Sequence, residues 1–236
     1  MQTIFITLNR GITNRNILRT GVLDKLAADK NRRIIILLQN PRNLPVPEYF
    51  LNEFAKENVI IEVTETKNLH GWERLFVGQS KRLTFSKSTR LNMLHNIKDQ
   101  KRKGRLAYLF LYLIFAPLSK MNWVKKLARK LDLWLFRNHD YEKYFDKYKP
   151  DLVFITSIIN YFDVDIMKEA VRRGIKTVAM PRSWDNIDKF LYRSEPDILL
   201  VQNEKMAEEA GRKVMELVWR DLRTRDIMTP ALSIIQ

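Results

Sequence analysis

The sequence predicts an α/β fold with a Rossmann-like parallel sheet. The clearest sign is a βαβ unit, in which two strand-like runs, Leu152–Ile155 and Thr177–Met180, flank a short helix that Gly174 ends. The amino-terminal part repeats this alternation of apolar runs and helical segments, which indicates right-handed parallel crossovers. With 236 residues, of which 45% are hydrophobic, the chain can bury one sizeable core and is rather short for two full domains.

Six runs rich in β-branched and other apolar residues are the expected strands. They are Thr3–Leu8, Arg33–Leu38, Val59–Val63, Leu152–Ile155, Thr177–Met180 and Ile198–Val201. A polar loop at 9–16 is expected after the first strand, followed by a helix from about Ile17 to Ala28. The segment Glu48–Lys56 suits a second, short helix before the third strand.

The β signal disappears between Lys67 and Lys149, where basic residues accumulate. The spacing of apolar residues predicts helices at 89–103, 106–115, 122–136 and 140–148. We therefore expect residues 67–149 to form a basic, helical insertion before the fourth strand. A segment of this kind is where contacts with a partner or a membrane would be added.

The most apolar segment, Leu106–Leu118, is shorter than the roughly 20 apolar residues that a membrane-spanning helix needs. Lysines and arginines flank it on both sides, and Trp123 and Trp134 follow it. One interpretation is a helix that lies in the interface of an anionic membrane. The side chains expected to contact lipid are Leu109, Phe110, Leu113 and Trp123. The other interpretation is a core helix that covers the sheet, and the sequence leaves both open.

A formal net charge of +15 is the strongest signal in the composition. It favours polyanionic partners, which are nucleic acid, anionic lipid or phosphorylated small molecules. Nucleic acid is disfavoured, because the sequence has no zinc-finger spacing, no RNP-type aromatic motif and no evident helix-turn-helix. We therefore expect an anionic membrane surface as a partner, at the inner face of the cell membrane.

Several classes of site have no support in the sequence. Cysteine is absent, which excludes disulfides, thiolate metal sites and cysteine nucleophiles and fits a reducing compartment. The histidines lie at no metal-ligand spacing, and neither a Gly-x-Gly-x-x-Gly fingerprint nor a P-loop occurs, so we expect no metal and no cofactor. Met1 leads directly into a strand-like run, from which we expect no secretory signal and a cytoplasmic location.

Polar side chains follow three of the expected strands. They are Thr156 and Ser157, then Ser183, Asp185 and Asn186, then Gln202, Asn203 and Glu204. Because parallel strands end at the same edge of a sheet, we expect these groups to face one cleft. Trp184 could supply an apolar wall that raises the pKa of Asp185, as general-base catalysis requires. The spacing alone favours the alternative, an Asx turn or helix cap at Asp185.

The loop after the first strand contains Arg10, Gly11 and Arg15. Glycine allows a ligand to approach the backbone closely, and arginines present planar pairs of donors to phosphate or carboxylate. These residues are therefore candidates for binding an anionic part of a substrate. A tight turn is the better explanation of the glycine when it is taken alone.

Four short segments resemble segments of a known protein family. They are Asn16–Gly21, Lys149–Phe154, Ser183–Asn186 and Pro196–Glu204. Together they resemble the amino-terminal half of GT-B-type glycosyltransferases, in the branch that makes surface or capsular polysaccharide and belongs to the UDP-glycosyltransferase and glycogen phosphorylase superfamily. The similarity covers roughly the first 205 positions.

The resemblance implies two Rossmann-like domains, one for the acceptor and one for the nucleotide-sugar, with a cleft between them. Residues 1–205 would be the acceptor-side domain, a single GT-B-type half, and residues 206–236 a terminal helix and tail. About thirty residues after Glu204 are too few for a donor domain, so we expect a partner to supply it. The implied reaction transfers a sugar from a nucleotide-sugar to a glycan or lipid-linked acceptor.

In the implied reaction Asp185 would be the general base that deprotonates the acceptor hydroxyl. The residues expected to contact substrate are Arg10, Gly11, Arg15, Arg19, Ser183, Trp184 and Asn186. A second class of function stays open. In it the same cleft holds a glycan or a phosphorylated ligand without turnover, and the chain is a binding or scaffold module or a truncated remnant.

Overall fold

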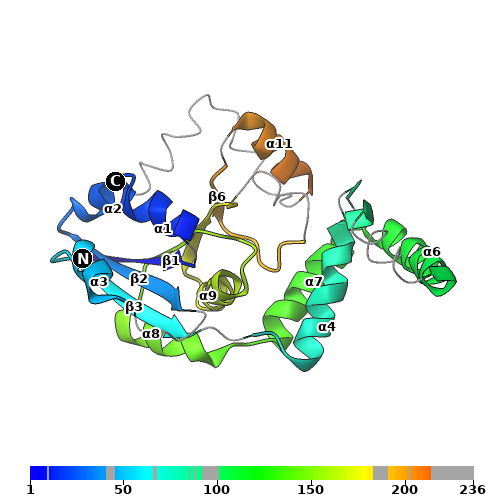
Figure 1. The fold of residues 1–236 in the computed structure, drawn as a ribbon, viewed down its shortest axis with the longest axis horizontal. Helices are drawn as coiled ribbons and strands as arrows, with labels where there is room; N and C mark the ends of the chain where they lie inside the picture. The colour runs from blue at the N-terminus through cyan, green and yellow to red at the C-terminus, as the bar shows by residue number, and fades with distance from the viewer. Residues whose placement is uncertain are drawn as a thin grey trace.

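The computed structural model describes residues 1–9, 11–40, 46–65, 68–84, 86–87, 89–91, 101–182, 191–201 and 203–213. They form an α/β fold around a six-stranded parallel sheet with the strand order β3-β2-β1-β4-β5-β6. The strands are β1 (Gln2–Leu8), β2 (Arg32–Asn40), β3 (Val59–Glu65), β4 (Leu152–Ile155), β5 (Lys176–Ala179) and β6 (Ile198–Leu199) (Figure 1). The predicted Rossmann-like sheet is confirmed, and each strand ends within two residues of its predicted bounds.

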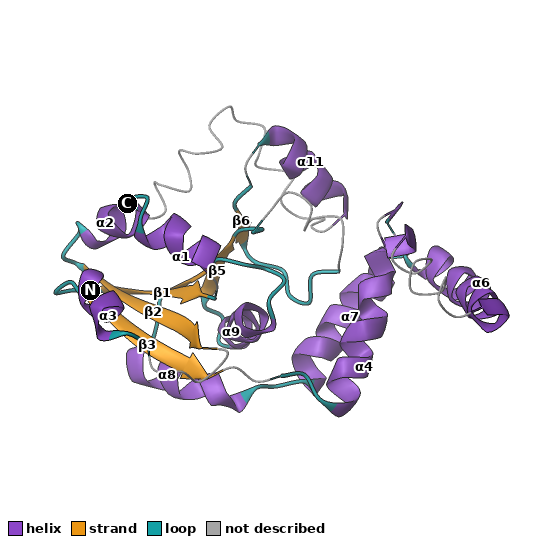
Figure 2. Ribbon diagram, in the orientation of Figure 1, coloured by secondary structure: helices purple, strands orange, loops and turns teal. Residues whose placement is uncertain are grey.

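Helices cover both faces of the sheet (Figure 2). Alternate residues of β1 point to opposite faces, so Ile4 and Ile6 pack against one set of helices while Phe5 packs against the other. The first set is α1 (Gly11–Leu18), α2 (Val22–Ala27) and α3 (Glu48–Glu53), and the second includes α8 (Glu142–Tyr148) and α9 (Tyr161–Arg172). Helix α11 (Glu204–Lys213) follows β6, and its Met206 lies in the same core cluster as Phe5.

The segment after β1 differs from the sequence prediction. The predicted polar loop at 9–16 is largely helical, because α1 begins at Gly11. The single helix predicted from Ile17 to Ala28 is wrong as well, since α1 ends at Leu18 and α2 begins at Val22. Gly21 separates the two helices with a φ of 78°, a left-handed conformation that glycine adopts without a steric penalty. The turn lets both short helices bury leucines against the sheet.

The described residues between β3 and β4 contain helices and no strand. These helices are α4 (Gly71–Ser80), η1 (Lys81–Thr84), α6 (Lys101–Leu118), α7 (Asn122–Leu135), η2 (His139–Tyr141) and α8. Figure 1 shows α4 and α7 side by side, standing away from the sheet, with α6 beyond them. We call α4, α6 and α7 the helical arm. The helix predicted at 89–103 lies largely outside the described residues.

A buried charge cluster fixes the arm to the rest of the molecule. Asp132 of α7 accepts hydrogen bonds from Lys168 Nζ of α9 at 2.6 Å and from Arg193 Nε at 2.6 Å. Arg193 also donates through Nη2 to Glu73 of α4 at 2.7 Å. Three segments far apart in sequence therefore meet at Asp132, which is almost completely buried.

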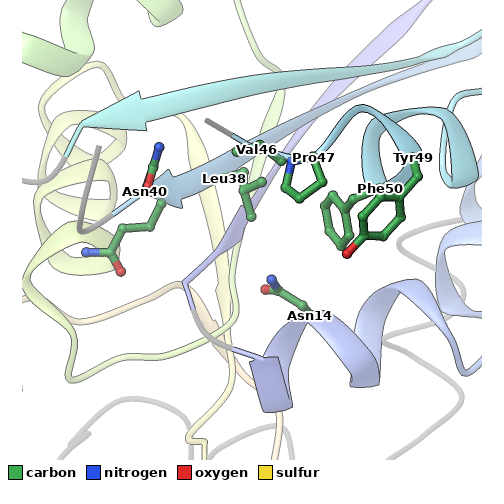
Figure 3. A pocket seen from close by; sticks show the side chains of 8 residues that line it. Asn14, Leu38, Asn40, Val46, Pro47, Tyr49 and Phe50 are labelled. Atoms are coloured by element: carbon green, nitrogen blue, oxygen red, sulfur yellow. The ribbon is translucent and has the colours of Figure 1, made fainter. Parts of the chain in front are cut away.

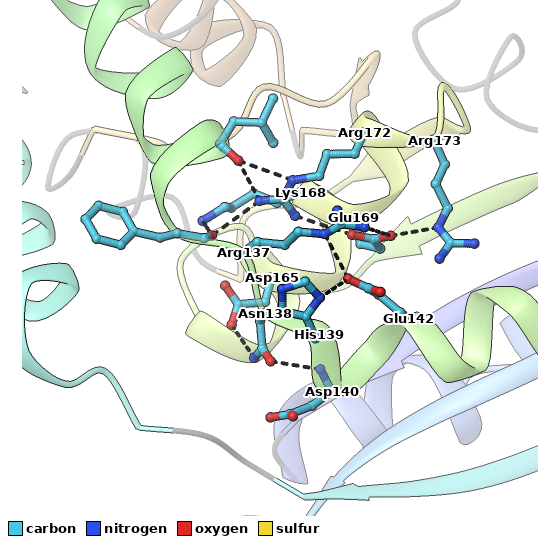
Figure 4. Close-up of polar contacts among 12 residues, drawn as sticks. Arg137, Asn138, His139, Asp140, Glu142, Asp165, Lys168, Glu169, Arg172 and Arg173 are labelled. Carbon is cyan, nitrogen blue, oxygen red and sulfur yellow. Dashed lines mark hydrogen bonds and ion pairs between the residues drawn. The ribbon is translucent and has the colours of Figure 1, made fainter.

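Basic side chains of α9 also contact the carboxyl end of α7. Lys168 Nζ donates to the carbonyl of Phe136 at 2.7 Å, and Arg172 Nη2 donates to the carbonyl of Leu133 at 2.6 Å (Figure 4). The last carbonyls of a helix lack partners within the helix and carry partial negative charge. Lys168 and Arg172 donate hydrogen bonds to these carbonyls and so hold the carboxyl end of α7 against α9.

Candidate functional site

The candidate site lies at the edge where the strands end, at the point where the strand order changes direction. In sheets of this order, β1 and β4 are neighbours but lead to connections on opposite sides, and a ligand-binding crevice lies beyond their carboxyl ends. Beyond β1 follow Asn9 and helix α1, and beyond β4 follow Thr156 and helix α9. We call this region the switch-point edge.

A network of buried polar side chains ties the switch-point edge together. The Thr7 hydroxyl and the Asn9 amide both donate hydrogen bonds to the carboxylate of Asp163, in the first turn of α9. Across the strands, the backbone N–H of Thr156 donates to Thr7 Oγ1 at 3.1 Å, and Thr156 Oγ1 donates to the carbonyl of Thr7 at 2.6 Å. The ends of β1 and β4 and the start of α9 are thus held as one rigid unit.

Burial raises the pKa of Asp163 to about 7, and the hydrogen bonds from Thr7 and Asn9 offset only part of that effect. Asp163 is 0% exposed, so its carboxylate has no path to a substrate on the surface. We therefore interpret it as a positioning residue that orients Asn9 and the start of α1. The sequence interpretation missed it, because it counted Asp163 only as the beginning of a helix.

Two hollows lie along this edge. The first is a recess of about 10 Å³ lined by residues of α1 and of the segments that follow β4 and β5, including Thr13, Thr156 and Arg182. It has room for no more than a water molecule. The recess shows that α1 and the segment after β5 converge on the end of β4.

The second hollow is an open pocket of about 220 Å³ on the β2 side of the edge (Figure 3). It is lined by residues of α1, the end of β2, the segment that leads into α3, and α3 itself. They are Asn14, Leu38, Gln39, Asn40, Val46, Pro47, Tyr49 and Phe50. We call it the Tyr49 pocket. The sequence interpretation missed it, because its walls come from residues separated by more than thirty positions.

The predicted substrate-binding residues fall into two groups. Arg10, Ser183, Trp184, Asp185 and Asn186 lie outside the described residues. The others are described: Gly11 is the first residue of α1, and Arg15 and Arg19 have exposed side chains. Arg19 pairs with Glu53 of α3 at 2.9 Å and does not line either hollow.

The predicted membrane contacts are exposed. On α6, the side chain of Leu113 is 71% exposed, and those of Leu109 and Phe110 are more than half exposed. Trp123 at the start of α7 is 64% exposed. In Figure 1, α6 stands apart from the sheet, so the interpretation of this segment as a core helix that covers the sheet is wrong.

Helix α7 presents an apolar stripe to the outside of the molecule. Its exposed apolar residues recur at helical spacing along one side, and they are Trp123, Leu127, Leu131, Trp134 and Leu135. Trp134 is 78% exposed. Lys126 and Lys130 are also exposed, whereas Asp132 is buried against α9. This orientation is the reverse of an ordinary surface helix, which turns its apolar side to the core.

Within the described part of the chain, no helix is both long and apolar enough to cross a bilayer. The same residues contain no group of three histidines or carboxylates that could hold a metal ion. No model of a known protein family matches the chain. No curated protein sequence matches it either. The function is therefore inferred from the residues and the geometry of the chain itself.

Proposed function

We propose that the protein is the acceptor-side half of a GT-B-type glycosyltransferase that works at an anionic membrane surface. The observation that carries the proposal is the combination of an open switch-point edge with an arm that exposes apolar and basic side chains. The edge offers a place for an acceptor, and the arm offers a means of holding that place near lipid. A lipid-linked acceptor needs both, because its glycan is in water while its anchor stays in the bilayer.

Transfer would follow the usual route of sugar transfer from a nucleotide-sugar. The acceptor hydroxyl attacks the anomeric carbon, the bond from that carbon to the diphosphate breaks, and the nucleoside diphosphate leaves. A base removes the hydroxyl proton as the glycosidic bond forms. We assign that role to Asp185, and we assign contacts with phosphate oxygens to Arg10 and Arg15. The nucleotide-sugar would be held by a second domain.

One observation favours a second candidate, a binding module without turnover. The carboxylate that the structure describes at the junction of β1, β4 and α9 is Asp163, and it is enclosed and hydrogen-bonded on both oxygens. It can position a ligand-binding edge but cannot deprotonate an acceptor. Catalysis by this chain would therefore depend on Asp185, and without that role the edge would bind a glycan and release it unchanged.

Deletion of the gene in the cell that makes this protein tests the proposal. We expect the surface polysaccharide to lose one sugar or to disappear, and the wild-type gene to restore it. A gene that encodes Asp185→Asn should not restore it if Asp185 is the base, whereas full restoration by that variant would leave the binding module as the remaining candidate. An unchanged surface polysaccharide in the deletion strain would contradict both roles in polysaccharide synthesis.

A further inference from the structure

The Tyr49 pocket has a lining that the proposed reaction does not yet explain. Its polar residues are three side-chain amides, Asn14, Gln39 and Asn40, and its other lining residues are apolar or aromatic. No charged side chain is among the described residues that line it. The described part of the lining therefore offers amide hydrogen bonds to a ligand rather than ion pairs. Amides donate and accept within one plane, which matches a ligand whose hydroxyl groups also do both.

The polar and the aromatic residues of the pocket come from different elements. Figure 3 shows Asn14 on the α1 side and Tyr49 and Phe50 on the side of α3. Two of the walls are fixed by contacts behind them. The ring of Phe50 packs edge-on against Phe54 with centroids 5.2 Å apart, and Gln39 Oε1 accepts a hydrogen bond from Asn160 at 2.9 Å. Fixed walls reduce the entropy that a ligand must overcome on binding.

Two features of the pocket are energetically unfavourable while no ligand is bound. The Oδ1 atom of Asn14 is buried and has no hydrogen-bond partner among the described residues. The side chain of Tyr49 is 73% exposed, although a tyrosine ring is a large apolar surface. An apolar face stacked on the ring would cover the second. A sugar ring presents such a face in its C–H groups, and its hydroxyls can bond to the amide atoms that line the open pocket.

We propose that the Tyr49 pocket binds one neutral sugar ring, stacked on Tyr49 and hydrogen-bonded to Asn14 and the neighbouring amides. The pocket volume of about 220 Å³ is below the roughly 300–1,000 Å³ of sites for drug-sized molecules, which suits one ring better than a whole nucleotide. The inference rests on the proposed function in one respect, that the ring belongs to the acceptor glycan. It places that glycan on the β2 side of the switch-point edge.

Saturation-transfer NMR on the purified full chain tests the inference. The probes are the neutral disaccharides cellobiose, maltose and N,N'-diacetylchitobiose, with AMP and glucose 1-phosphate as charged comparisons. We expect transfer to the ring protons of at least one disaccharide, and weaker transfer to both charged probes. Tyr49→Ala and Asn14→Ala should each weaken the binding by about fivefold or more. Tyr112→Ala, which removes a tyrosine of α6 outside the pocket, should not.

The absence of transfer to all three disaccharides would overturn the inference. So would stronger binding of AMP than of any disaccharide, or wild-type binding by both pocket variants once circular dichroism shows that they are folded. The outcome is separable from that of the deletion experiment. Failure here with an altered surface polysaccharide would place the acceptor elsewhere on the edge, whereas sugar binding with an unaltered polysaccharide would leave a sugar site without the transferase role.

Discussion

Burial in the fold disfavours the charged form of the Asp163 carboxyl group. Its pKa rises from 3.8 to about 7, chiefly because burial penalises the charged form. Between these two values the folded chain binds more protons at this site than the unfolded chain does. The free energy of unfolding therefore falls as the pH rises from about 4 to about 7, and the contribution of Asp163 is constant above that range.

Replacement of Asp163 by Asn should remove this part of the pH dependence. We expect the wild-type protein to lose up to about 4 kcal/mol between pH 4 and pH 7 because of this group, at 1.36 kcal/mol per pKa unit. Asp163→Asn should lose measurably less over the same range. Burial also raises the pKa of Asp165, so part of the slope should persist in the variant. Urea unfolding at a series of pH values measures the difference.

The control for this experiment is Asp24→Asn, which changes an exposed carboxylate of α2. It should keep the wild-type slope. Equal slopes for the wild type and Asp163→Asn would contradict the burial argument, because they would mean that this carboxylate titrates alike in the folded and unfolded chains.

Individual site residues were only partly predictable from the sequence. Of the polar residues predicted to follow the strands, Thr156 and Ser157 come after β4 and Asn203 and Glu204 come after β6. Ser183, Asp185, Asn186 and Gln202 lie outside the described residues, so the predicted common cleft stays a prediction. The pairing of Asp163 with Thr7 and Asn9 joins residues more than 150 positions apart. No local pattern encodes such a contact. The same reason explains why the amides and rings of the Tyr49 pocket were missed.

At the scale of elements, the junction of α7 and α9 depends on a buried group of charges. Lys168 and Arg193 both bind the carboxylate of Asp132, and burial lowers the pKa of Lys168. The loss of one member of such a group leaves the others buried without a partner. The group therefore determines how the arm packs against α9, and it adds little net free energy of unfolding.

Asp132→Asn should destabilise the protein by about 3–5 kcal/mol, because it removes the counter-charge of buried Lys168 and leaves Arg193 paired with Glu73 alone. The matched change is Glu53→Gln, which breaks the exposed ion pair with Arg19 at 2.9 Å. That change should cost less than about 1 kcal/mol. Urea unfolding of both variants measures the two costs, and equal costs would contradict the assigned role of the buried cluster.

The spacing of apolar residues predicted the helices of the arm, but it did not predict which side of each helix is buried. The predictions for 106–115 and 122–136 are confirmed by α6 and α7, because apolar residues at helical spacing are a local signal. Whether an apolar side faces a core or a membrane depends on what packs against it. In α7 the buried side is the one that holds Asp132, a choice that the distant residues Lys168 and Arg193 determine.

At the scale of the whole molecule, the sheet and the arm are distinct parts. The sheet supplies an edge with a recess and an open pocket, and the arm extends sideways from it (Figure 1). The exposed apolar side chains of the arm lie beside lysines, a combination that suits the interface of an anionic bilayer. We propose that the arm binds such a surface and so brings the edge to a lipid-linked acceptor.

Co-sedimentation with lipid vesicles tests whether the arm binds a membrane. We expect the wild-type chain to bind vesicles that contain phosphatidylglycerol, to bind pure phosphatidylcholine vesicles weakly, and to bind less as salt is added. The double variant Trp123→Ser/Trp134→Ser should bind about tenfold more weakly or worse, which corresponds to about 1.4 kcal/mol. Val63→Ser, a change of an exposed apolar residue of β3, should bind as the wild type does. Equal failure to bind both kinds of vesicle, or unchanged binding by the double variant, would contradict the claim.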